Sequence, residues 1–168
     1  MIVLTRLCDL SQEEFPRLVL TLGAFDGIHL GHQRVLARVV EEARKIRGTP
    51  ALLTFQEHPQ KGLRPEARIR ILTSFRHKLS LIREAGIRLV LALRFDLAFS
   101  RFSPREFVAR ILVDRFHVTK VILGHDARFG HGREGDAEIM AKLAGEHGFE
   151  FEAVPPVRKG RLAVKSTL

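Results

Sequence analysis

Short apolar runs alternate along the chain with longer segments in which apolar residues recur at helical spacing. The runs have strand length and lie at residues 2–4, 18–20, 51–55, 87–93, 120–123 and 149–154. The segments between them carry a helical stripe, seen first at Val35, Val39, Ala43 and Ile46. This alternation predicts an α/β fold: an open parallel sheet of about five main strands, with helices on both faces and right-handed crossovers.

Capping and breaking residues indicate where the helices begin and end. Gly48 closes the first helix and Pro50 punctuates the loop after it. Thr73 is positioned to cap the next helix, which Gly86 ends. The sequence Ser103-Pro104-Arg105-Glu106 combines a cap, a proline at the first helical position and a glutamate three residues after the cap. It predicts a helix that continues to about residue 116.

Three phenylalanines, Phe95, Phe99 and Phe102, cluster in a predicted loop. Such a cluster could line a cofactor site or belong to the core. Burial is the usual state of phenylalanine, so we expect these rings to pack in the core.

A strand-to-helix turn at residues 20–32 carries the strongest chemical signal. Tight turns and close approach of a ligand to the main chain are allowed by three glycines, Gly23, Gly27 and Gly31. His29 and His32 lie three residues apart at the start of the helix, so they can share one face. The helix adds its unpaired N–H groups and the positive end of its dipole. Together these groups suit a polyphosphate.

Two other interpretations of this turn stay open. A glycine-containing turn before a helix is often only a turn, with its histidines solvated. His29 and His32 could also form half of a zinc site. The absence of cysteines or an acidic cluster at ligand spacing disfavours that alternative.

A second glycine-rich segment, residues 124–135, follows the run 120–123 and precedes a helix predicted over residues 136–147. Arg128 or Arg133 could neutralise a phosphate, and Phe129 could stack on a flat ring. The alternative is a surface loop whose ion pairs contribute little energy.

His58 follows the run 51–55, and ligands of open α/β sheets sit at the carboxyl ends of strands. His58 could therefore border a substrate. An exposed loop histidine is an equally good interpretation.

Composition and charge narrow the classes of partner. The net charge is +9 with arginine commoner than lysine, which favours anionic partners without specifying one. Cys8 is the single cysteine, so no internal disulfide can form, as is typical of a reducing compartment. The first residues lack the layout of a signal peptide, and no apolar run approaches membrane-spanning length. We expect a cytoplasmic protein without a membrane partner.

The first turn resembles a known family signature. The pattern Gly23-x-Phe25-Asp26-Gly27-x-His29-x-Gly31-His32 is similar to the signature of the FAD synthetase (FMN adenylyltransferase) module, which forms the N-terminal half of the bacterial bifunctional riboflavin kinase/FAD synthetase. The shorter His-x-Gly-His core resembles the wider nucleotidylyltransferase superfamily.

Three further segments resemble the same family in the expected order. The second signature matches at Gly124, Asp126, Arg128, Phe129, Gly130, Arg133 and Gly135, with Ala127 in place of the usual phenylalanine. The family's Phe-(Asp/Glu)-Pro-His-Pro is kept at Phe55, His58 and Pro59, with Gln56 and Glu57 departing from it. The end of the chain is similar to the start of a Ser-Ser-Thr-x-Ile-Arg element, with Lys165 in place of its first serine.

The resemblance implies a Rossmann-like nucleotidylyltransferase fold in one domain over residues 1–168, and transfer of AMP from ATP to FMN with Mg²⁺, giving FAD and pyrophosphate. His29 and His32 would be catalytic. ATP would contact Gly23, Phe25, Asp26, His29, Gly31, His32, Gly124, Ser166 and Thr167. FMN would contact His58, Pro59, Asp126, Arg128 and Phe129, and Asp126 would also approach the metal.

Two rival functions remain. One is another nucleotidylyltransferase with a different phosphorylated acceptor. The other is a basic nucleic-acid-binding domain, which is disfavoured because no basic stripe runs along any predicted helix. Residues 1–168 leave no room for a riboflavin kinase domain, so a covalently linked one would lie beyond residue 168. The chain also stops before the Ile-Arg of the last element, so we expect it to fold but to be a poor adenylyltransferase as given.

Overall fold

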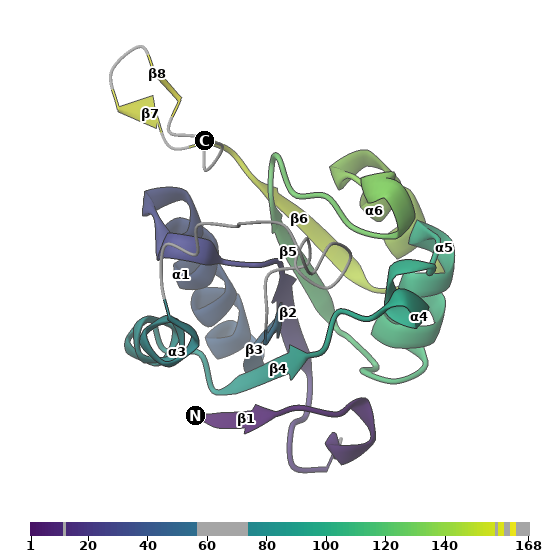
Figure 1. Ribbon diagram of the computed structural model, residues 1–168, viewed down its shortest axis with the longest axis horizontal. Coiled ribbons are helices and arrows are strands. Elements are labelled where there is room, and N and C mark those ends of the chain that lie inside the picture. The colour runs from purple at the N-terminus through teal and green to yellow at the C-terminus, as the bar shows by residue number, and fades with distance from the viewer. Residues whose placement is uncertain (12, 57–73, 157, 160–161, 164–168) are drawn as a thin grey trace.

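The computed structural model describes residues 1–11, 13–56, 74–156, 158–159 and 162–163. Six parallel strands form one open sheet in the order β1-β4-β3-β2-β5-β6 (Figure 1). They are β1 (Ile2–Leu4), β2 (Leu18–Leu22), β3 (Thr49–Phe55), β4 (Leu89–Leu93), β5 (Lys120–Gly124) and β6 (Glu150–Val154). Two short strands, β7 (Arg158–Lys159) and β8 (Leu162–Ala163), form a separate antiparallel pair. The α/β prediction is confirmed, with six strands in place of about five because β1 pairs with β4 at the sheet edge.

Helices cover both faces of this sheet. On one face lie α1 (Leu30–Lys45) and α3 (Phe75–Glu84). The other face is covered by α4 (Leu97–Ser100), α5 (Pro104–Glu106), the π-helical segment η3 (Phe107–Val113) and α6 (Ala137–His147). Short 3₁₀ turns lie at η1 (Leu7–Asp9), η2 (Asp26–Ile28) and η4 (His131–Arg133).

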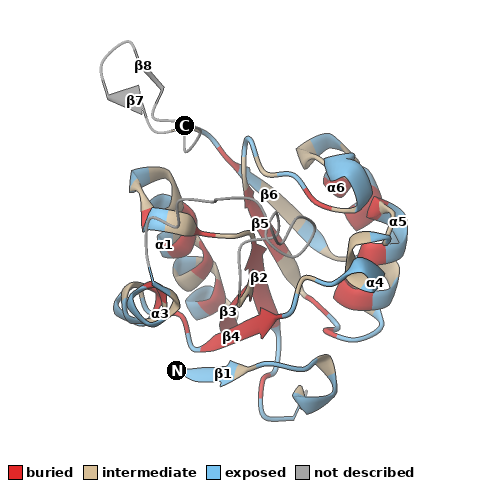
Figure 2. Cartoon of the chain, viewed as in Figure 1, coloured by how far each residue is buried: buried red, intermediate tan, exposed pale blue. Residues whose placement is uncertain are grey.

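The central strands are buried on both faces, which explains their continuous apolar runs (Figure 2). Successive side chains point to opposite faces. Leu18 and Leu20 therefore join the core under η3 and α6, whereas Val19 joins the core under α1 and α3.

The direction of chain progress across the sheet reverses at β2. From β2 the chain moves to β3 and then β4 on one side, while β5 and β6 lie on the other. Ligands of open α/β sheets bind outside the carboxyl ends of strands at such a reversal. The carboxyl ends of β2 and β5 are therefore the expected place for a site.

Most helix ends agree with the sequence. Ser103 and Glu106 form the predicted capping box, and Asp136 caps α6 by accepting a hydrogen bond from the Ile139 N–H. Pro50 is an exception, because it lies inside β3 rather than in a loop. Its carbonyl accepts from the Arg88 N–H, and its position near the strand start makes the missing N–H tolerable.

Two other local predictions need correction. The side chain that caps α3 is Ser74, which accepts from the His77 N–H, whereas the predicted cap Thr73 lies outside the described residues. Phe99 lies in the short helix α4 rather than a loop. Its ring and that of Phe102 pack against the core, which confirms the expected role of these two side chains.

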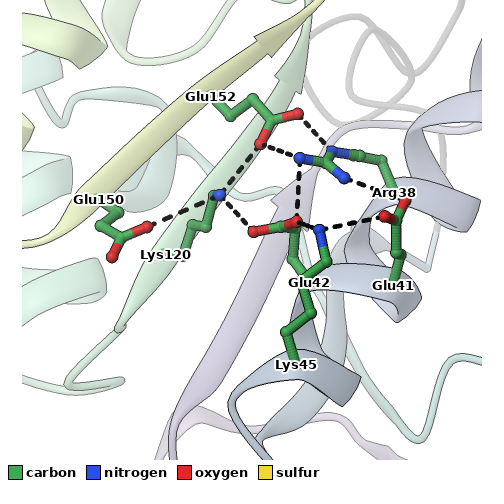
Figure 3. A network of polar contacts seen from close by, with 7 residues as sticks. All are labelled: Arg38, Glu41, Glu42, Lys45, Lys120, Glu150 and Glu152. Atoms are coloured by element: carbon green, nitrogen blue, oxygen red, sulfur yellow. Dashed lines mark hydrogen bonds and ion pairs between the residues drawn. The ribbon is translucent and has the colours of Figure 1, made fainter.

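A network of ion pairs ties α1 to β5 and β6 (Figure 3). Lys120 of β5 lies 2.6 Å from Glu42 of α1 and 3.0 Å from Glu152 of β6. Arg38 bridges the same two carboxylates from α1. The Lys120 and Lys45 ammonium groups lower the pKa of Glu42 to about 2. The network therefore fixes the helix that begins at the histidine turn. No helix in the described part of the chain is long and apolar enough to cross a membrane.

Candidate active site

The turn between β2 and α1 has an unusual backbone. Phe25, Gly27 and Ile28 all have positive φ, at 53°, 72° and 34°. Only glycine adopts this region freely, so Phe25 and above all the β-branched Ile28 hold strained conformations. The turn is anchored at its start by the Gly23 N–H, which donates to the Leu53 carbonyl at 3.0 Å. Strain of this kind persists only where surrounding contacts hold it.

His29 is both a site residue and the N-cap of α1. Its Nδ1 accepts a hydrogen bond from the Gly31 N–H at 3.1 Å. In the neutral ring the proton must then sit on Nε2, which is left to donate elsewhere. The helix cap therefore fixes both the orientation and the tautomer of His29.

His29 and His32 form a stacked pair at the start of α1. Their ring centroids lie 3.7 Å apart with an interplanar angle of 27°, and the ring of Phe25 lies 4.6 Å from His32. Nε2 of His29 and Nδ1 of His32 are buried without a hydrogen-bond partner among the described residues. Such orphaned nitrogens are costly unless a ligand or water satisfies them.

Burial keeps both imidazoles neutral near pH 7. It lowers the pKa of His32 to about 4, with a further lowering from His29, and it also lowers the pKa of His29. The Asp126 carboxylate opposes both pKa shifts through its negative charge. Asp126 follows β5, so the two predicted glycine-rich segments meet at the reversal between β2 and β5.

The end of β5 lies against α1. A side chain at Gly124 would contact Val35 of α1 at 3.8 Å and Asp126 at 3.4 Å. The Asp126 carboxylate itself is half exposed and lies 3.9 Å from Nδ1 of His125. The carboxyl-end edge of the sheet thus holds most of the residues predicted to contact ATP or the metal: Gly23, Phe25, Asp26, His29, Gly31, His32, Gly124 and Asp126.

Two predicted flavin-side residues, Phe129 and Arg128, have contacts within the described part of the chain. Phe129 is only 6% exposed, packs 5.8 Å from the ring of Phe107 and pairs with Gly135 in an isolated bridge. The Phe129 ring therefore belongs to the core, and its contact with FMN stays a prediction. Arg128 is exposed and lies 3.8 Å from Asp136. Ala127, at the position where the signature has phenylalanine, packs half-buried against the core.

The other predicted ligand residues are not described by the structure. His58, Pro59, Ser166 and Thr167 lie outside the described residues. Their roles therefore stay predictions.

Sequence reasoning missed Lys78 of α3 and its partner Thr54 at the end of β3. Both side chains are buried, and both donate a hydrogen bond to the carbonyl of Ala24 in the histidine turn. One signal was available: Lys78 occupies the apolar face of its helix, one turn before Ile82.

Metal ligands are sparse at this site. No group of three or more His, Cys, Asp or Glu side chains in the described ranges could hold a metal ion. Half-exposed carboxylates suit Mg²⁺, which often takes only one or two protein carboxylates and fills its other positions with water or substrate oxygens. Asp126 is such a carboxylate.

Comparison with known proteins decides the family. The sequence profile described as FAD synthetase matches residues 11–168, nearly the whole chain. The chain belongs to the FAD synthetase family.

Curated relatives agree with membership of the FAD synthetase family. The chain is 34% identical over 159 residues to the bifunctional riboflavin kinase/FMN adenylyltransferase of Escherichia coli K12, covering 95% of this chain and 51% of that protein. It is 36% identical over 155 residues to the protein of the same name from Pseudomonas fluorescens, covering 89% and 48%. The chain thus spans about half the length of these relatives.

A solved structure shows the same fold. The crystal structure described as a macrolide-efflux protein from Streptococcus pneumoniae superimposes with a TM-score of 0.85 over 99% of this chain and 55% of that one. The sequence identity is 24%, so this likeness concerns the fold alone.

Proposed function

We propose that the chain is an FMN adenylyltransferase, which transfers AMP from ATP to FMN. One observation carries the proposal. Two stacked histidines with unsatisfied ring nitrogens lie at the N-terminus of α1, beside Asp126, at the switch point of a FAD synthetase family fold. Ring N–H groups, a helix N-terminus and a nearby carboxylate suit a nucleotide triphosphate with its cation.

The proposed reaction is a direct displacement at phosphorus. A phosphate oxygen of FMN attacks the α-phosphorus of ATP and forms the new P–O bond of FAD. The bond between the α-phosphorus and the bridging oxygen to the β-phosphate breaks, and pyrophosphate leaves with that electron pair. Catalysis then depends on alignment and on stabilising charge, without a covalent enzyme intermediate.

The two histidines would supply the charge stabilisation. His29 is held with Nδ1 as acceptor, so its Nε2–H is the group left to donate to a phosphate oxygen. His32 is neutral in the empty site because burial lowers its pKa to about 4. A bound triphosphate would favour the protonated form and raise that pKa, strengthening the contact as negative charge accumulates.

The remaining ATP contacts would come from the turn after β2, from the end of β5 and from residues 166–167. Gly23, Phe25, Asp26, Gly31 and Gly124 border the same edge of the sheet and would approach the nucleotide. Ser166 and Thr167 would donate hydrogen bonds to phosphate. When bound, Mg²⁺ would neutralise the charge of the phosphates, with Asp126 as its protein contact.

On the acceptor side, His58, Pro59, Asp126, Arg128 and Phe129 would border FMN. Arg128 is exposed and only loosely paired with Asp136 at 3.8 Å, so its guanidinium can turn to a phosphate. We propose a cytoplasmic location as well, because the single cysteine fits a reducing compartment. A covalently linked riboflavin kinase domain, as the relatives' names suggest, stays a prediction.

The test is incubation of the protein with FMN, ATP and Mg²⁺, followed by separation of the flavins. FAD and pyrophosphate should form in equal amounts. Replacing FMN by other phosphorylated acceptors tests the nearest alternative. Product from another acceptor, with no FAD formed from FMN, would identify a different nucleotidylyltransferase. No product with any acceptor, together with salt-sensitive retention on polyanions, would favour a nucleic-acid-binding domain.

A further inference from the structure

Lys78 is the one charged side chain among the buried residues of the described part of the chain. It is 5% exposed and lies on the inner face of α3 with Ile82. Its Nζ donates to the Ala24 carbonyl at 2.9 Å, to Thr54 Oγ1 at 3.1 Å and to the Phe55 carbonyl at 3.2 Å. Burying a charged ammonium costs free energy, so packing alone does not account for a lysine at this position.

The three partners show that Lys78 is charged. Two of them are carbonyl oxygens, which only accept. The third, Thr54 Oγ1, gives its own hydrogen to the Ala24 carbonyl at 3.2 Å and so also accepts from Lys78. Three acceptors require three N–H donors, which the ammonium has and the neutral amine lacks. Burial lowers the pKa of Lys78, and Asp26 opposes that shift.

These contacts join two segments of the site. Ala24 directly precedes the strained residues of the histidine turn, and Thr54 and Phe55 end the neighbouring strand β3. The Ala24 carbonyl receives two hydrogen bonds, one from Lys78 and one from Thr54. A conformation with positive φ at Phe25, Gly27 and Ile28 needs such external support.

We propose that Lys78 is a positioning residue for the phosphate site: its ammonium fixes the Ala24 carbonyl against the end of β3 and so holds the turn that carries His29 and His32. The proposal deepens the proposed function and rests on it for its kinetic consequence. Within the described ranges, the hydrogen bonds of Lys78 go to Ala24, Thr54 and Phe55, none of which is assigned to the catalytic machinery. Lys78 acts through the backbone of the turn.

The decisive variant is Lys78→Met, which keeps the stem and removes the three donors. We expect kcat for FAD formation to fall about 10- to 100-fold, because misplacement of catalytic groups by about 1 Å can have effects of that size. The KM for FMN should change less than about threefold, since the Lys78 ammonium is buried and its three donors are taken up by Ala24, Thr54 and Phe55. Ile82→Val is the matched control, because it disturbs the same buried face of α3 without touching Ala24.

All variants are assayed at a temperature at which melting curves show them folded. The proposal predicts that Ile82→Val keeps kcat within about twofold of the parent while losing some stability. Equal losses of kcat in Lys78→Met and Ile82→Val would overturn the proposal, because they would reflect general destabilisation. Unchanged kcat in Lys78→Met would overturn it as well.

A second variant covers the case in which Lys78→Met does not fold. Thr54→Val removes the hydroxyl that links Lys78 to Ala24 and nearly preserves shape. It should lower kcat in the same direction by a smaller factor. Where both single variants fold, the double variant should lose less than the product of the two factors, because both act on one network. A Thr54→Val enzyme with the kcat of the parent would contradict the proposal.

Amide hydrogen exchange separates this proposal from the proposed function. Loss of the Lys78 contacts should speed exchange of the hydrogen-bonded amides of Gly23 and Gly31, at the two ends of the turn, by about tenfold or more, whereas Ile82→Val should leave their relative protection unchanged. If the parent makes no FAD and this contrast still appears, the positioning role stands and the proposed activity is wrong. Unchanged exchange in Lys78→Met would overturn the positioning role whatever the activity.

Discussion

At the residue scale, His29 has a structural role and a proposed catalytic role, and one substitution can separate the two. It caps α1 through Nδ1 and presents Nε2 to the ligand. We predict that His29→Ala lowers turnover about 10²–10³-fold and lowers the free energy of unfolding by about 1 kcal/mol. His29→Asn should keep the cap acceptor and most of the stability, yet show the same loss of turnover. FAD formation and urea unfolding measure the two effects.

His32→Ala is expected to lose turnover to a similar degree with the fold intact. Near-parental turnover in both His29→Asn and His32→Ala would contradict the assigned role. Metal analysis gives an independent check, because stoichiometric zinc that disappears in His32→Ala would instead support a zinc site.

His32 should also make stability depend on pH. Its pKa is lowered from the ordinary 6.5 to about 4 by burial and by His29, with Asp126 opposing. Between these values the unfolded chain binds a proton that the folded protein refuses, so stability falls as the pH drops from 6.5 towards 4. We predict a loss of about 2 kcal/mol between pH 7.5 and pH 5 from this group. Urea unfolding of His32→Gln should lack that part of the loss; an identical pH dependence in both proteins would refute the assignment.

At the element scale, α1 depends on the network that ties it to β5 and β6. Lys120 is 12% exposed and contacts Glu42, which is 13% exposed, whereas Lys45 contacts the same carboxylate from a site that is 55% exposed. We predict that Lys120→Met lowers the free energy of unfolding by about 1–2 kcal/mol, between the values typical of surface and buried pairs. Lys45→Met is the matched control and should cost less than about 1 kcal/mol.

Urea unfolding at low and high salt measures both variants. The Lys45 contribution should shrink further in salt, because exposed charges are screened more strongly than buried ones. Equal effects of the two substitutions would show that burial does not set the strength of this network.

At the scale of the whole molecule, the net charge of +9 should assist the capture of anionic substrates. The histidines at the site are neutral when it is empty, so attraction at a distance must come from the helix N-terminus and from the overall positive field. We predict that the KM for ATP rises several-fold between about 50 mM and about 500 mM NaCl, with a smaller change in kcat. Steady-state kinetics across that range test the point, and a constant KM would show that the excess charge serves another purpose.

Local sequence determined the secondary structure and the chemistry of the turn. Apolar spacing, caps and glycines act over a few residues, so the strands, the main helices and the pairing of His29 with His32 at the start of α1 follow from neighbours in the chain. The capping box at Ser103 and Glu106 is one case. Pro50 is the counterexample, because its place in β3 depends on the partner strand.

Only the tertiary structure decided which segments meet. Strand order is not encoded in periodicity, and the order found here places the turn after β2 beside the segment after β5, about a hundred residues later in the chain. The same packing buries Phe129 in the core and brings the Lys78 ammonium under Ala24. Helical spacing places Lys78 on the apolar face of its helix, but the carbonyls that accept from it and the ring that packs on Phe129 come from distant segments, which spacing cannot identify.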